Sequence, residues 1–116
     1  MITILVIDAD PLVRLLAKCV LDVAGFTVIA VADAGSALNL LQSLKADLAI
    51  CDFDLPGPSG ASAIGTIAEF DPGVRVLRLF PKDRDAGLIL GSVPSALGKP
   101  FTTSELLGKV RRSLAE

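Results

Sequence analysis

Three kinds of side chain are missing from the sequence: histidine, tryptophan and tyrosine do not occur among its 116 residues. Without histidine, the chain offers no Ser-His-Asp triad, no histidine zinc site and no phosphohistidine. Its aromatic residues are limited to five phenylalanines, and its net charge is −2. A weakly acidic chain with few aromatic rings is a poor candidate for nucleic-acid binding, which depends on phosphate contacts and base stacking.

Cysteines and long apolar runs are also scarce. Cys19 and Cys51 have no C-x-x-C partner, so we interpret both as small buried hydrophobic residues in a reducing compartment. No apolar run approaches the roughly 18 residues of a membrane span. The N-terminus lacks the basic segment of a secretory signal. We therefore expect a cytoplasmic protein that does not contact a membrane.

The chain does contain a regular alternation of short β-branched runs and longer helical patterns, and 52% of it is hydrophobic. The apolar runs predict strands over residues 2–7, 27–32, 47–51, 74–80 and 95–98. Helices are predicted from Pro11 to a stop at Gly25, from Asp33 through Leu44, over 59–70, over 82–91, and from a cap at Thr103 or Ser104 to about Leu114. Thr102-x-x-Glu105 resembles a capping box for the last helix.

The first helix carries the clearest local signals. Asp10 is its expected N-cap, and Pro11 its first residue. Its apolar residues recur at three- and four-residue steps, as in a helix that packs one stripe against a core. These residues are Leu12, Leu16, Cys19, Val20 and Val23.

This alternation predicts an α/β fold: a doubly wound, five-stranded parallel sheet, (βα)₅, with helices on both faces. In such sheets, functional residues gather at the carboxyl ends of the strands. Asp8, Asp52, Phe80 and Lys99 all stand at predicted strand ends. Three of these four residues are charged, although the burial of the strands would favour apolar residues at these positions.

Together, two carboxylates and an amine have a recognisable chemistry. Carboxylates at one sheet edge suit a hard cation such as Mg²⁺. An aspartate beside a cation and a lysine can attack a phosphoryl group, and the lysine can pair with the phosphoryl oxygens. Each residue taken singly has an ordinary alternative, because a strand-end acid is often a helix cap and a lysine before proline is often a surface residue.

Four segments of the chain form a recognisable set: residues 4–14 (ILVIDADPLVR), residues 47–52 (DLAICD), Pro56-Gly57, and Gly98-Lys99-Pro100-Phe101. Together, in this order, they resemble the receiver domain of two-component response regulators. The resemblance implies a flavodoxin-like fold. We expect a single receiver (response regulatory) domain over residues 1–116 with no output domain, either as a stand-alone receiver or as one excised from a longer protein. It also implies phosphorelay signalling without substrate turnover, in which a histidine kinase or phosphotransfer protein phosphorylates the domain and an unknown downstream protein responds. A homodimer is left open.

By the same resemblance, Asp52 is the phosphoacceptor and Lys99 the phosphate-pairing lysine. Mg²⁺ would be held by Asp8, Asp52 and the backbone carbonyl of Asp54. The family has a second acid where this chain has Ala9, so we expect Mg²⁺ to bind more weakly. Asp54 and Asp10 are alternative carboxylate ligands, although Asp10 is primarily the expected helix cap.

The expected switch positions are also degenerate. Strand 4 of the family ends in Thr or Ser, where this chain has Phe80, and strand 5 often carries an aromatic residue, where it has Ala96. The segment between Phe80 and Lys99 is also shorter than in typical members. Two further hypotheses therefore remain: a pseudo-receiver that binds partners without phosphorylation, and a haloacid-dehalogenase-type phosphatase, whose Asp-x-Asp motif matches Asp8-Ala9-Asp10.

Overall fold

The computed structural model describes residues 1–52, 67, 69, 71, 73–81 and 96–115. Five parallel strands form one sheet in the order β2-β1-β3-β4-β5. The strands are β1 Thr3–Ile7, β2 Thr27–Val31, β3 Leu48–Asp52, β4 Arg75–Pro81 and β5 Ala96–Lys99. The helices are α1 Pro11–Val23, α2 Ala34–Leu41 and α5 Thr103–Ala115.

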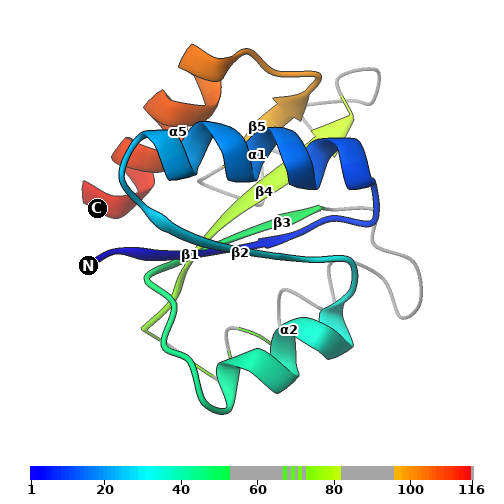
Figure 1. The fold of residues 1–116 in the computed structure, drawn as a ribbon, viewed down its shortest axis with the longest axis vertical. Helices are drawn as coiled ribbons and strands as arrows, with labels where there is room; N and C mark the ends of the chain where they lie inside the picture. The colour runs from blue at the N-terminus through cyan, green and yellow to red at the C-terminus, as the bar shows by residue number, and fades with distance from the viewer. Residues whose placement is uncertain (53–66, 68, 70, 72, 82–95, 116) are drawn as a thin grey trace.

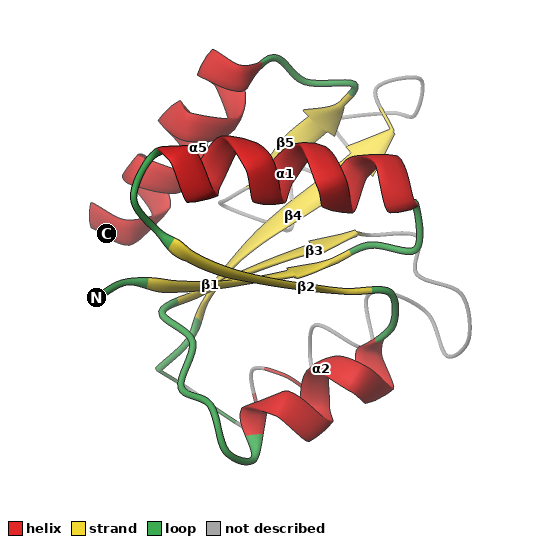
Figure 2. Ribbon diagram, in the orientation of Figure 1, coloured by secondary structure: helices red, strands yellow, loops and turns green. Residues whose placement is uncertain are grey.

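The sheet lies between two helical layers, which confirms the predicted fold class. Helices α1 and α5 cover one face, and α2 lies on the other (Figure 1). The strands form the middle layer (Figure 2). Two clusters of buried side chains fill the space between the layers, one on each face. Because both faces are covered, the central strands β1 and β3 are buried along almost their whole length and are largely apolar rather than alternating with polar residues.

Side-chain alternation along the central strands decides which face each residue serves. Ile4 and Val6 of β1 belong to the cluster beneath α1 and α5, whereas Leu5 and Ile7 belong to the cluster beneath α2. The same alternation in β3 places Ile50 with the first cluster and Cys51 with the second. Residues that continue the alternation of Ile4, Val6 and Ile50 past the ends of these strands therefore lie on the face of the sheet that α1 and α5 cover.

Each predicted strand exists, with its ends displaced by at most one residue. The first strand begins at Thr3 rather than Ile2, because hydrogen bonds with Asp47 fix its start. The third strand extends to Asp52, so this residue is the last of the strand rather than the first of the loop. The predicted helices at 59–70 and 82–91 lie largely outside the described residues, as does Asp54.

Local caps define the helix ends. Asp10 accepts a hydrogen bond from the Leu12 amide, which confirms its role as N-cap of α1. Gly25 follows α1 with a φ of 99°, a left-handed conformation that favours glycine. In α5 the capping residue is Thr102 rather than Thr103 or Ser104, because Thr102 and Glu105 exchange reciprocal hydrogen bonds.

Two further predictions about helices were wrong. Helix α2 ends at Leu41, so Leu44 lies beyond it, where its amide bonds the Leu40 carbonyl. The apolar stripe chosen for α1 is mostly its outer face: Leu12 is 73% exposed and Val23 is 89% exposed. The residues that α1 buries are Ala17 and Leu21, with Val13 and Val20 packed beside them.

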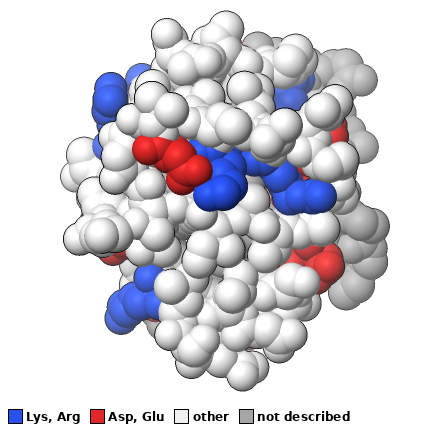
Figure 3. Space-filling model, viewed as in Figure 1, with Lys and Arg blue, Asp and Glu red and all other residues white. Residues whose placement is uncertain are grey.

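The outer face of α1 is therefore unusually apolar for a surface. Leu15 and Leu16 are also exposed, as is Cys19, which corrects the prediction that both cysteines are buried. In the space-filling view, the surface over α1 and α5 is largely uncharged apart from a band of charged side chains along one side of α1 (Figure 3). No helix in the described part of the chain is long and apolar enough to cross a membrane.

Candidate functional site

Three strands bring Asp8, Asp52 and Lys99 to one edge of the sheet. Asp8 directly follows β1, whereas Asp52 and Lys99 are the last residues of β3 and β5. Strands β1 and β3 are paired neighbours, so their ends carry the two carboxylates side by side. β4 separates β3 from β5, and the long lysine side chain spans it to reach both acids.

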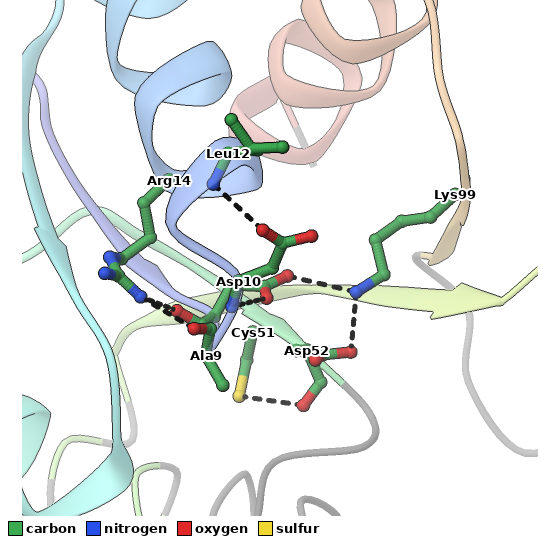
Figure 4. A network of polar contacts seen from close by, with 8 residues as sticks. Ala9, Asp10, Leu12, Arg14, Cys51, Asp52 and Lys99 are labelled. Atoms are coloured by element: carbon green, nitrogen blue, oxygen red, sulfur yellow. Dashed lines mark hydrogen bonds and ion pairs between the residues drawn. The ribbon is translucent and has the colours of Figure 1, made fainter.

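Lys99 bridges the two carboxylates. Its Nζ lies 3.1 Å from Oδ2 of Asp8 and 3.1 Å from Oδ1 of Asp52 (Figure 4). The Asp8 side chain is only 1% exposed and that of Asp52 8%, whereas the Lys99 side chain is 21% exposed. Two acids this deeply buried need a positive charge beside them, and Lys99 supplies it.

The protonation of these groups follows from burial and from their mutual contacts. Burial raises the pKa of Asp8, and the nearby Asp52 charge adds to this, against the lowering effects of the Asp10 amide and Lys99. Partial burial lowers the pKa of Lys99, but its hydrogen bonds with Asp52 and Asp8 outweigh that effect. The net result is a raised pKa for Lys99, so it stays a cation at neutral pH.

The loop after β1 holds the Asp8 carboxylate in place. The Asp10 amide donates to Oδ1 of Asp8 at 2.9 Å, and the Asp8 amide donates to the Val31 carbonyl at 3.1 Å. Arg14 returns from α1 to the same loop, where its Nη1 donates to the Asp8 carbonyl at 2.7 Å and the Ala9 carbonyl at 3.0 Å. Sequence reasoning assigned Arg14 no role, and its position four residues after the N-cap was the available signal.

The donor set suits Mg²⁺ only in part. Mg²⁺ typically takes one or two carboxylates and keeps several waters, which Asp8 and Asp52 can satisfy. Among the described residues, however, no three acids, histidines or cysteines are grouped as metal ligands. Ala9 carries no carboxylate, and Asp10 uses a side-chain oxygen to cap α1.

Cys51 directly precedes Asp52 but has an unreactive thiol. Its side chain is fully buried in the cluster beneath α2. Burial, followed by the nearby Asp52 charge, raises the pKa of the thiol to about 12. The thiol therefore stays protonated at neutral pH and is a poor nucleophile.

Phe80 and Ala96, which the sequence analysis predicted to be switch positions, are buried on the neighbouring strands β4 and β5. Phe80 is 6% exposed, and Ala96 4%. Their register partners are unequal in size: Phe80 lies opposite Gly98, and Arg78 lies opposite Ala96. Two large side chains of β4, Arg78 and Phe80, are therefore paired with the two smallest residues of β5.

Comparison with known proteins agrees with this geometry. The response regulator receiver domain family matches residues 4–111. The DNA-binding response regulator MtrA of Mycolicibacterium smegmatis is 32% identical over 114 residues, which are 96% of this chain and 50% of that protein. Regulatory protein VirG of Rhizobium rhizogenes is 32% identical over 117 residues, covering 97% of this chain and 48% of its own. The chain thus spans about half the length of the curated relatives that it matches.

Solved structures show the same fold along the whole chain. A response regulator from Thermotoga maritima is 28% identical, with a TM-score of 0.88 over 100% of this chain and 99% of its own. The signal receiver domain of an HD domain-containing protein from Pseudomonas fluorescens is also 28% identical. Its TM-score is 0.87 over 98% of this chain and 94% of its own. The chain belongs to the response regulator receiver domain family, the phosphorelay signalling domains of two-component systems.

Proposed function

We propose that Asp52 accepts a phosphoryl group from a histidine kinase or phosphotransfer protein, with Lys99 pairing with the phosphoryl oxygens. The observation that carries this proposal is the Lys99 ammonium 3.1 Å from each of two buried carboxylates on separate strands. Such an arrangement concentrates a nucleophilic carboxylate and a neutralising cation at one partly exposed point. We further propose that Asp8 and Asp52 hold Mg²⁺ there.

In the reaction, an oxygen of Asp52 forms a bond to phosphorus while the P–N bond of the donor phosphohistidine breaks. The electron pair of that bond leaves with the donor imidazole. Lys99 offsets the negative charge of the phosphoryl oxygens, and Asp8 keeps Lys99 in position throughout. Mg²⁺ held by Asp8 and Asp52 would add further neutralisation of negative charge at the site.

The apolar outer face of α1 is the surface that we propose for contact with the donor protein. A hollow of about 140 Å³ joins α1 to the reactive lysine; it is lined by Leu12, Val13, Leu16, Lys99, Pro100 and Phe101. Leu12, Leu15 and Leu16 are exposed along this side of the domain. Exposed apolar side chains next to a reactive site fit a partner that must bring its own phosphorylated residue to it.

A pseudo-receiver is the second candidate, because specific residues favour it. Ala9 removes one carboxylate, and Phe80 has no hydroxyl with which to bond a phosphoryl group. Phosphatase turnover is disfavoured because Asp10, the second acid of the Asp-x-Asp motif, caps α1. We therefore propose a signalling domain without substrate turnover.

The test is incubation with acetyl phosphate and Mg²⁺, followed by intact mass measurement. We expect slow labelling that the Asp52→Asn variant abolishes. Asp10→Asn is the matched control: asparagine also caps helices well, so this variant should label normally. Labelling that persists in Asp52→Asn would refute the assignment of the acceptor, and no labelling at high donor concentration would favour the pseudo-receiver.

A further inference from the structure

Arg14 reaches back from the first turn of α1 to the loop that carries Asp8. The Arg14 amide donates to the Asp10 carbonyl at 3.1 Å, which places the residue one helical turn after the N-cap. Long helical side chains point toward the N-terminus, so the guanidinium comes to lie over the loop. Its Nη1 bonds two successive carbonyls there, those of Asp8 and Ala9. The side chain is half-buried in this position.

The peptide between Ala9 and Asp10 links Arg14 to the Asp8 carboxylate. Its carbonyl accepts from Arg14 at 3.0 Å, and its N–H donates to Oδ1 of Asp8 at 2.9 Å. The other oxygen of Asp8 bonds Lys99, which in turn bonds Asp52. A continuous chain of polar contacts thus runs from Arg14 to the acceptor, with Arg14 and Lys99 on opposite sides of Asp10 (Figure 4).

This connection has two physical consequences. A cation bonded to a peptide carbonyl polarises that peptide, so its N–H becomes a stronger donor to Asp8. Bonds to two successive carbonyls also stop both peptides from rotating, and this fixes the direction of the Asp8 side chain. Ala9 has no polar side chain with which to hold the loop itself.

We propose that Arg14 is a positioning residue for phosphoryl transfer: it orients the Asp8 carboxylate through the Ala9–Asp10 peptide and thereby sets Lys99 against Asp52. This role rests on the proposed function of Asp52 as acceptor. Arg14 does not contact the reacting atoms, so its effect passes entirely through the loop. Replacing a residue that orients the direct ligands of a metal typically changes metal affinity or activity roughly 10- to 100-fold.

The chain offers a matched control on the same helix. Lys18 is one turn further along α1, and its Nζ also donates to a backbone carbonyl, that of Val28, at 3.2 Å. It forms an ion pair with Asp22 at 2.9 Å, and its hydrogen bonds among the described residues go to Asp22 and Val28 rather than to the Asp8 loop. Lys18→Gln therefore removes one cation and one carbonyl contact from α1 without touching the chain of contacts to Asp52.

The experiment compares Arg14→Gln, Arg14→Lys and Lys18→Gln. In each, ¹H–¹⁵N spectra report the Asp10 amide, and intact mass gives the labelling rate with acetyl phosphate. For Arg14→Gln we expect an upfield shift and faster exchange of the Asp10 amide proton, with labelling slowed roughly tenfold. Arg14→Lys should fall between this variant and the wild type, because its single ammonium cannot hold both carbonyls equally well. Lys18→Gln should match the wild type in both measurements.

An unchanged Asp10 amide in Arg14→Gln, or a shifted amide with an unchanged labelling rate, would overturn the proposal. If Arg14→Gln does not fold, the graded result for Arg14→Lys decides the question in the same two measurements. The amide measurement needs no phosphorylation, so it stands even if Asp52→Asn shows that the acceptor was misassigned.

Discussion

Replacing Ala9 with aspartate should strengthen Mg²⁺ binding. Ala9 is exposed and follows Asp8, which is one of the two buried carboxylates bonded to Lys99. A new carboxylate there would add a third acid to a place where the described residues supply only two. The added ligand would also help Mg²⁺ to compete with Lys99 for the oxygens of Asp8 and Asp52.

The magnitude follows from the exposure of position 9. At water-like screening, a unit charge about 4 Å from a divalent cation is worth about 2 kcal/mol, or roughly thirtyfold in affinity. Lower screening toward the buried acids would increase this figure, and the cost of removing water from the new carboxylate would reduce it. We therefore expect a gain between about tenfold and a hundredfold.

The assay is a Mg²⁺ titration followed by amide chemical shifts, because the chain has no tryptophan whose fluorescence could report binding. Ala9→Asn is the matched control, since it adds an oxygen ligand of similar size without the charge. It should gain much less than Ala9→Asp. Equal affinities for wild type and Ala9→Asp would refute the reasoning and mean that Asp54 or Asp10 already supplies the third carboxylate.

Three further predictions concern pH, switching and the donor. The pKa of Lys99 is raised above 10.5 in the folded state. Its contribution to stability is therefore complete below pH 10.5 and is lost as the pH rises through the folded-state pKa. Urea unfolding should show this loss of stability in the wild type but not in Lys99→Met. A beryllofluoride adduct at Asp52 should shift the amide resonances near the site but leave those of residues 82–97 and α5 almost unchanged. The reason is that neither Phe80 nor Ala96 supplies the switching contacts expected of the family. Large shifts in residues 82–97 or in α5 would contradict this account. Leu15→Ser should slow transfer from a phosphorylated donor protein several-fold while leaving acetyl phosphate labelling unchanged, and equal slowing of both would argue against α1 as the contact surface.

The sequence was a good guide wherever a feature is local. The helix ends are set by contacts between residues close in sequence, so side-chain type and backbone preference predict them. Examples are Asp10, Gly25 and the Thr102–Glu105 pair. The meeting of Asp8, Asp52 and Lys99 was also predictable, because parallel strands carry their carboxyl ends to one edge. Their distances were not, since these depend on a lysine side chain crossing β4.

The packing of α1 shows where pattern reading fails. This helix has two apolar stripes, one with Ala17 and Leu21 and one with Leu12 and Leu16. Periodicity identifies a helix but cannot decide which stripe faces the sheet, and here it is the stripe with Ala17 and Leu21. Arg14 escaped prediction because its partners are backbone carbonyls, so that only its position four residues after the N-cap could have indicated its role.

The unequal surroundings of the two cysteines make the native chain a ready-made single-site probe. Cys51 is buried with a thiol pKa of about 12, whereas Cys19 is exposed on α1. A maleimide dye or spin label at neutral pH should therefore attach to Cys19 alone, without any engineered substitution. Attached there, it sits on the outer apolar face of α1 and would report the arrival of a donor protein in real time.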